Sequence, residues 1–245
     1  MQIPVEGVAP RLILTVGLHA SASTWVFNVV RELMVAAAGP ERVAPGFATT
    51  AEDIAGAEVA PDMFRVVKTH GWPDLPAFAR QRGAAVFVSV RDPRDAVLSL
   101  MQRFGDSLPV SASGIGQDCR CAHACADAPY PVLRYEDRFF ADRASIPGIA
   151  AQLGLALPPE RMDRIFRAWS TDAVQAMSEG VTALPPERRR ALGPNGAIDA
   201  ETLVTWRHIG DARTGKWREA FDSDVAGALT RHFFPFLLRF GYPAA

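Results

Sequence analysis

Residues 12–28 read LILTVGLHASASTWVFN, and this stretch restricts the possible fold more than any other part of the sequence. An apolar, β-branched run comes first, then a loop of glycine, small and hydroxyl residues, then a helical pattern of apolar residues. A strand, a loop and a helix in this order can surround an anion with backbone N–H groups and a helix N-terminus. Ser21, Ser23 and Thr24 could add hydroxyl donors. A plain turn in which a serine or threonine caps the helix explains the same residues.

Four nearly continuous apolar runs predict strands, at residues 12–16, 63–67, 84–90 and 131–135. Such runs are typical of a parallel sheet that is covered on both faces. The run 84–90 could also be the core of a helix, but its β-branched residues favour a strand. Helical patterns occupy residues 24–38, 145–153, 159–169 and about 218–232, and another helix follows the third run. This alternation predicts a doubly wound α/β fold.

The helix after the third run should begin at Asp92 as its N-cap, with Pro93 in the first turn and Asp95 closing a capping box. Residues 105–129 and 178–216 fit no element, so we expect irregular lids or binding loops there. No internal repeat and no domain boundary is visible, so we expect a single domain over residues 1–245.

The charge balance and the apolar pattern exclude several classes of protein. A net charge of −1 and a pI near 6.5 argue against a broad nucleic-acid-binding surface. The first residues lack the basic and apolar regions of a signal peptide. No apolar run approaches the roughly 18 residues of a membrane span. We therefore expect a soluble, cytoplasmic protein.

The three cysteines are Cys119, Cys121 and Cys125, with His123 between them. An odd number of cysteines without an export signal argues against a disulfide framework. Their spacing does not match the usual paired CxxC zinc motifs. An ordinary loop is therefore favoured over a zinc site.

Polar residues follow two of the expected strands. Lys68 and His70 stand at i and i+2, so on a strand they would face the same side. A cation beside an imidazole suits the transfer of an anionic group, since histidine accepts a proton near neutral pH and lysine stabilises negative charge. A polar strand end with an ordinary histidine is the alternative.

Arg91 ends the third run, and Ser99 lies about two turns into the helix that follows. An arginine can bind a phosphate bidentately, and a serine can add a hydroxyl. A salt bridge is an equally good explanation for Arg91. We assign Arg94 and Arg103 to a solvated helix face.

Compared with the nucleotide-binding pattern G-x-x-x-x-G-K-[ST], the second glycine falls at Ala22 and the lysine at Ser23. An ATPase or kinase uses that lysine together with an acidic magnesium ligand. No expected strand ends in an obvious aspartate for magnesium. The loop therefore suits a phosphate that is bound without a metal.

The order and content of these segments resemble the sulfotransferases that use 3′-phosphoadenosine 5′-phosphosulfate (PAPS). The family's PKSGTTW-like loop corresponds to HASASTW at residues 19–25, and its KTH recurs at residues 68–70. Its 3′-phosphate motif, R-[DN]-P-x-D-x-x-x-S, recurs at residues 91–99. A YEDL-like strand end recurs at residues 134–137, and the glycine-rich RKGxxGDW is echoed loosely at residues 207–217.

This resemblance implies a three-layer, P-loop NTPase-like fold and in-line transfer of a sulfuryl group from PAPS, with the bisphosphate PAP as product and no metal required. His70 would be the general base, and Lys68 and the amides of residues 21–24 would stabilise charge. The resemblance implies a cofactor site made of His19, Ala20, Ser21, Ala22, Ser23, Thr24, Trp25, Arg91, Ser99, Arg207, Arg213 and Gly215.

Two departures from the family pattern leave alternatives open. The family's loop lysine falls at Ala20 and its loop glycine at Ala22. The work of the lysine could pass to Lys68, to His19 or to a basic residue of the C-terminal loop. A nucleotide-dependent kinase on the same fold and a catalytically weak nucleotide-binding relative are the rival functions.

The acceptor would be a hydroxyl or amine of a small molecule, a lipid or a saccharide, and the sequence does not distinguish these. Residues 105–129 and 178–216 would border its site, because variable loops set specificity on a fixed scaffold. A homo-oligomer is also compatible with the sequence.

Overall fold

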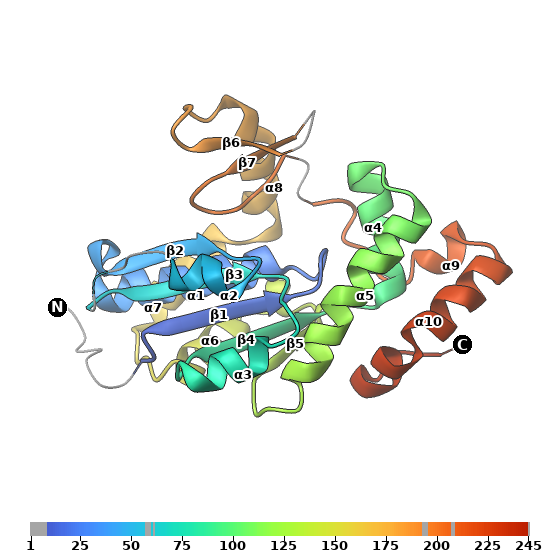
Figure 1. Cartoon of the computed structure of the whole chain (residues 1–245). Coiled ribbons are helices and arrows are strands. Elements are labelled where there is room, and N and C mark those ends of the chain that lie inside the picture. Colours follow the sequence, from blue (N-terminus) through green and yellow to red (C-terminus); the bar gives the residue numbers. More distant parts are fainter. Residues whose placement is uncertain (1–8, 57–59, 61, 193–195, 207–208, 245) are drawn as a thin grey trace.

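The computed structural model describes residues 9–56, 60, 62–192, 196–206 and 209–244, and a five-stranded parallel sheet forms its centre (Figure 1). The strands are β1 (Leu12–Gly17), β2 (Val43–Phe47), β3 (Phe64–Thr69), β4 (Ala85–Val90) and β5 (Val132–Arg134). Their order is β2-β3-β1-β4-β5. The predicted parallel α/β fold is therefore confirmed.

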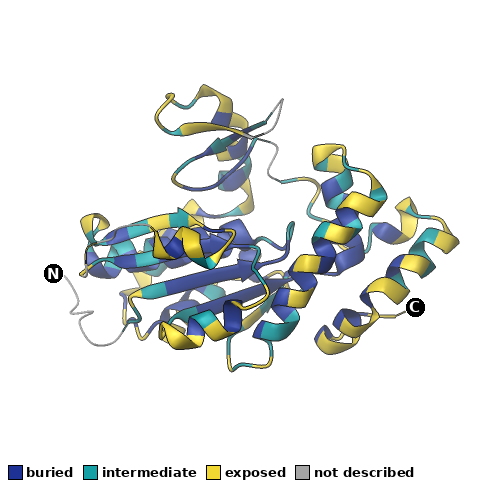
Figure 2. Cartoon of the chain, in the orientation of Figure 1, coloured by how far each residue is buried: buried dark blue, intermediate teal, exposed yellow. Residues whose placement is uncertain are grey.

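Helices cover both faces of this sheet because alternate strand residues point to opposite sides. Ile13 of β1 packs into one core with Phe64 and Phe87, whereas its neighbour Leu14 packs into the other core with Val67. The first core includes α1 (Ser23–Ala38), α6 (Ser145–Gln152) and α7 (Pro159–Ala168). The second includes α3 (Leu75–Gln81), α4 (Pro93–Phe104), α5 (Leu108–Cys125) and α10 (Ser223–Phe240). Figure 2 shows the resulting three layers, with buried strands and exposed outer helix surfaces.

Shorter elements complete the chain. The helices are α2 (Ala51–Ala55), α8 (Thr171–Gly180) and α9 (Trp217–Ala220), and an antiparallel hairpin pairs β6 (Arg189–Leu192) with β7 (Gly196–Asp199). Single 3₁₀ turns lie at Pro40–Arg42, Tyr135–Asp137, Phe139–Ala141 and Val181–Ala183. Among the described helices, none combines the length and apolar character needed to cross a bilayer.

The main correction to the sequence interpretation concerns residues 105–129. This segment was expected to be irregular, but most of it is the helix α5. Its serines, cysteines and glycines are poor helix formers, yet Ile115 and Cys125 are fully buried in the second core. Tertiary packing therefore outweighs the weak local preference. The three cysteines are free thiols buried in this helix.

Three further differences are smaller. The edge strand β2 was missed because Pro45 and Gly46 interrupt its apolar pattern, and proline is tolerated at a sheet edge. Residues 178–216, expected to be irregular, contain the β6-β7 hairpin. The last helix begins later than predicted, because Asp222 caps it through the backbone N–H groups of Asp224 and Val225. It extends to Phe240.

The chain leaves β1 toward β2 at one edge of the sheet and later passes from β3 to β4 on the other side of β1. In open α/β sheets this reversal creates a crevice at the carboxyl ends of the strands, where ligands bind. The carboxyl end of β1 is Gly17, where the loop singled out by the sequence begins.

Candidate active site

The loop between β1 and α1 is shaped by hydrogen bonds within the protein. The Ser21 hydroxyl lies 2.7 Å from the Leu18 carbonyl oxygen and 2.9 Å from the Ser89 hydroxyl, and Ser21 is fully buried. A Cβ at Gly17 would lie 2.1 Å from the Ser89 hydroxyl and 2.5 Å from Ser23 Cβ. Ser21 therefore holds the loop rather than facing a ligand, and only glycine fits at the end of β1.

Helix α1 begins without a side-chain cap. Its N-cap is Ala22, so the alternative of a capping serine or threonine is wrong. Ser23 and Thr24 occupy the first turn, where backbone N–H groups have no acceptor inside the helix. Donors of this kind suit a bound anion.

Two alanines of this loop adopt the left-handed conformation that glycine favours. The φ angles are 61° at Ala20 and 59° at Ala22. This conformation costs an L-residue about 1–2 kcal/mol. The loop therefore keeps a glycine-type backbone at Ala22 although the glycine itself is absent.

His70, just beyond β3, points one ring nitrogen at the loop. Its Nδ1 lies 2.7 Å from the Gly17 carbonyl oxygen, and because a carbonyl only accepts, Nδ1 carries the hydrogen. The neutral ring therefore presents a free lone pair on Nε2. Burial, followed by the charges of Lys68 and His19, lowers the pKa of His70 well below its usual value. The ring is accordingly neutral at pH 7 and able to accept a proton.

Lys68 lies on the same side of β3 as His70, as the alternation predicted. Phe47 contacts both, with its ring 5.7 Å from Lys68 Nζ and 6.0 Å from the His70 ring. Lys68 is 7% exposed. Burial, with a smaller effect from Arg103, lowers the pKa of Lys68 to about 8, while Asp118 opposes the shift. A buried cation thus lies beside the free base.

His19 forms a pair that the sequence did not reveal. Its Nδ1 and its backbone N–H lie 2.7 and 2.8 Å from the same carboxylate oxygen, Oδ2 of the buried Asp118. The His19 ring stacks on His70 with 3.5 Å between ring centroids and 11° between planes. Asp118 lies 99 residues away, in the helix that was expected to be a loop, so no local signal connected the two.

The side chains of His19, His70 and Asp118 are also the group of potential metal ligands found among the described residues, with ligand atoms within 4.8 Å of one another. Cys119, Cys121 and Cys125 do not belong to it.

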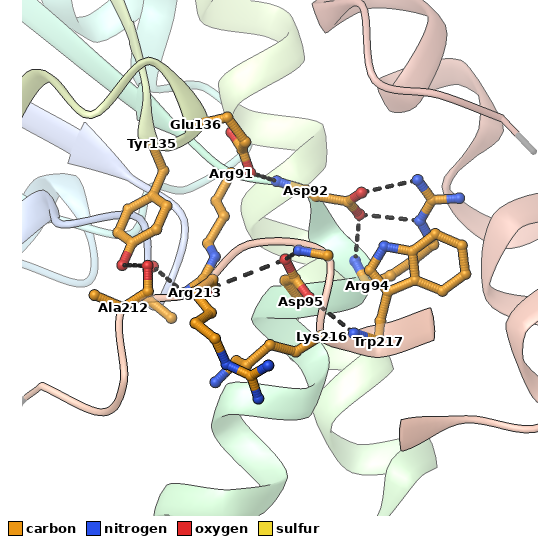
Figure 3. A network of polar contacts seen from close by, with 12 residues as sticks. Arg91, Asp92, Arg94, Asp95, Tyr135, Glu136, Ala212, Arg213, Lys216 and Trp217 are labelled. Carbon is orange, nitrogen blue, oxygen red and sulfur yellow. Dashed lines mark hydrogen bonds and ion pairs between the residues drawn. The ribbon is translucent and has the colours of Figure 1, made fainter. Parts of the chain in front are cut away.

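Arg91 follows β4 and connects the loop to residues 205–206 and 209–217, here called the C-terminal segment (Figure 3). Its guanidinium donates to the carbonyl oxygens of Ala20 at 3.0 Å and Arg213 at 2.9 Å, and it lies 4.2 Å from the centre of the Tyr135 ring. Arg91 is 4% exposed, and its Nε has no acceptor among the described residues. A phosphate at Arg91 would therefore replace a carbonyl contact or approach Nε.

The helix α4 begins at Asp92 and Pro93 as predicted, but Asp95 does not close a capping box. Its carboxylate instead accepts from the backbone N–H groups of Gly215 at 2.5 Å and Trp217 at 3.0 Å (Figure 3). The nearby Glu136 carboxylate accepts from the backbone N–H of Asp92 at 3.0 Å.

Ser99 is half-buried on the same face of α4 as Asp95 and Arg103, because residues four apart share one helix face. Asp95 binds the C-terminal segment, and Arg103 donates to the Thr205 hydroxyl. Ser99 therefore lies between the residues of α4 that contact Thr205 and Gly215.

The prediction of a solvated helix face for Arg94 and Arg103 is wrong. Arg94 is fully buried; it binds both oxygens of the Asp92 carboxylate at 3.0 and 2.8 Å and stacks 3.9 Å from the centre of the Trp217 ring. Arg103 is half-buried, with a pKa lowered to about 10 by burial. The C-terminal segment covers both side chains.

The basic residues of the C-terminal segment are engaged in local ion pairs. Asp211 lies 2.9 Å from both Arg213 and Lys216, and Arg213 is largely exposed. Gly215 has a φ of +76°, as its turn requires. Arg207 lies outside the described residues.

No protein-family profile and no curated protein matches this sequence. Solved structures do match. Retinol dehydratase bound to retinol and PAP aligns over 94% of this chain and 82% of its own, with 16% identity and a TM-score of 0.64. The same enzyme with androsterone and the inactive cofactor PAP aligns over 94% and 81%, with 16% identity and a TM-score of 0.64. Mouse sulfotransferase SULT7A1 bound to PAP aligns over 92% and 84%, with 14% identity and a TM-score of 0.61.

The chain has the sulfotransferase fold.

Within this sulfotransferase fold, the segments singled out by the sequence meet at the carboxyl end of β1. His70 touches Gly17, Arg91 touches Ala20, and both lie next to strands that pair with β1. Trp25 belongs to the core instead, where its ring N–H donates to the Trp169 carbonyl at 2.8 Å.

Proposed function

We propose that this chain is a single sulfotransferase domain over residues 1–245 that moves a sulfuryl group from PAPS to a hydroxyl or amine. The observation that carries the proposal is the position of His70. Its protonated Nδ1 is fixed by Gly17 at the base of the anion-binding loop, so its free Nε2 stands beside that loop. A base next to an anion-binding helix terminus suits transfer of an anionic group from a phosphate donor.

In the proposed reaction His70 accepts the proton of the acceptor as the acceptor oxygen or nitrogen attacks sulfur. Lys68 and the N–H groups at the start of α1 stabilise the charge on the transferred group and on the leaving phosphate. Arg91, Ser99 and the segment around Gly215 bind the 3′-phosphate. No metal takes part, because these side chains supply the positive charge.

The ligand in the matching structures supports this proposal, since retinol dehydratase and mouse SULT7A1 both carry PAP. The acceptor we leave as a small molecule, lipid or saccharide. One place for it is a cavity of about 620 Å³ between α2 and α3. Trp72, two residues beyond His70, lines it together with Phe78 and Asp74.

Calorimetry with three ligands tests the proposal. We expect PAP to bind without a metal and more tightly than ATP with magnesium, because PAP alone carries a 3′-phosphate. A kinase on the same fold would reverse this order. Radiolabelled PAPS with a panel of phenols, alcohols, amines and sugars then distinguishes a transferase from a catalytically weak relative, which would bind PAP but transfer no label.

A further inference from the structure

The loop that faces the donor contains no lysine or arginine. Between Gly17 and Trp25 the one side chain that can carry a positive charge is His19. A sulfuryl transfer leaves negative charge on the phosphate that departs, and stabilising such charge is usually a large part of catalysis. A cation on the loop itself would add to the charge that Lys68 supplies from β3.

The surroundings of His19 suit that task. The Asp118 carboxylate only accepts, so His19 Nδ1 carries a hydrogen and Nε2 points away from the pair. Asp118 is 5% exposed and also accepts the backbone N–H of His19, so ring and main chain are fixed together. The pair therefore fixes the ring and leaves Nε2 to face a ligand of the loop.

The partner ring of the stack has a different hydrogen-bond partner. His70 Nδ1 donates to a neutral carbonyl, and the Lys68 charge lies nearby, so His70 stays neutral.

We propose that His19, held by Asp118, is a second catalytic residue that binds the departing 5′-phosphate through Nε2–H and takes the place of the missing loop lysine. The inference rests on the proposed function. The acceptor atom bonds to sulfur and its proton passes to His70 Nε2. The bond from sulfur to the phosphate oxygen breaks, its electron pair stays on that oxygen, and His19 stabilises the resulting charge. Asp118 is a positioning residue.

PAP tests this without knowledge of the acceptor, because its 5′-phosphate carries the charge that develops on the leaving group. We would measure the affinities of PAP and of adenosine 3′-phosphate, which lacks the 5′-phosphate, by calorimetry. His19→Gln should weaken PAP binding roughly 10- to 100-fold, the range for a hydrogen bond to a charged group, and should leave adenosine 3′-phosphate within about twofold. His232→Gln, on the exposed side of α10, is the matched control and should change neither affinity.

A double-mutant cycle tests the role of Asp118. Asp118→Asn should weaken PAP binding in the wild-type background and should have no further effect in the His19→Gln background, because it acts through His19. A merely structural role would weaken binding in both backgrounds. If Asp118→Asn does not fold, the His19 comparison decides alone.

The two proposals fail in different ways. A wild-type chain that binds no PAP refutes the sulfotransferase function. A wild-type chain that binds PAP, while His19→Gln loses nothing or loses equally for both nucleotides, refutes only the role of His19.

Discussion

At the scale of residues, the site depends on two identical side chains with different neighbours. His70 donates to a carbonyl and His19 to a carboxylate, and the proposed mechanism gives them different tasks on this basis. Removal of the base should therefore affect the rate and spare binding.

We expect His70→Gln to lower kcat on the order of 10²–10⁴-fold, the usual contribution of a proton-transfer group. The measurement is single-turnover transfer from labelled PAPS, with PAP affinity as the control for folding. Unchanged turnover would remove His70 from the mechanism.

Lys68 provides a pH-dependent prediction. With its pKa near 8, Lys68 is charged at pH 7 and largely neutral at pH 9. The phosphates of PAP are fully ionised in this range and favour the charged lysine, so binding above pH 8 must take up a proton. PAP affinity should therefore fall about tenfold per pH unit above pH 8.

Calorimetry in buffers of different ionisation enthalpy would show the uptake directly. The Lys68→Met variant should bind more weakly at pH 7 and lose the pH dependence. A wild-type affinity that stays constant from pH 7 to 9.5 would contradict the proposed contact.

At the scale of elements, the loop after β1 is held by close packing at Gly17. Since a Cβ there would overlap Ser89 and Ser23, Gly17→Ala should destabilise the fold by about 1–3 kcal/mol. Gly114 in α5 is a matched control, because a Cβ there meets nothing within 4 Å. Gly114→Ala should instead stabilise by roughly 0.5–1 kcal/mol, because alanine favours a helix. Urea denaturation measures both, and equal effects would contradict this account of the loop.

The elements also show what a single sequence can reveal. The central strands were predictable because continuous apolar runs mark buried parallel strands, and the residues at their ends lie where such strands place them. Helix α5 was not predictable, because its glycines, serines and cysteines favour helix weakly and its stability comes from packing. Asp118 lies in this helix, so its contact with His19 could not be predicted either. Buried Arg94 was misassigned for a related reason, since the Trp217 that covers it lies far along the chain.

At the scale of the whole molecule, residues 209–243 close over the start of α4. Asp95 is fully buried and holds this segment through the backbone N–H groups of Gly215 and Trp217. Asp95→Ala should destabilise the protein by roughly 3–6 kcal/mol, because each of the two hydrogen bonds to the carboxylate contributes about 1.5–3 kcal/mol. Faster hydrogen exchange at residues 215–217 should accompany the loss. The exposed Asp224→Ala on α10 is the control, and an equal loss in both variants would contradict the assignment.

The link between Asp95 and Gly215 also affects how the protein is made. The two residues are 120 positions apart, so the first leaves the ribosome well before the second. At about 5–20 residues per second, the delay is roughly 6–24 seconds. During that interval a nascent chain would expose a carboxylate and an arginine that the finished protein keeps buried. Cofactor capture would therefore follow translation rather than accompany it, and a chaperone that shields the start of α4 would improve the yield of active protein.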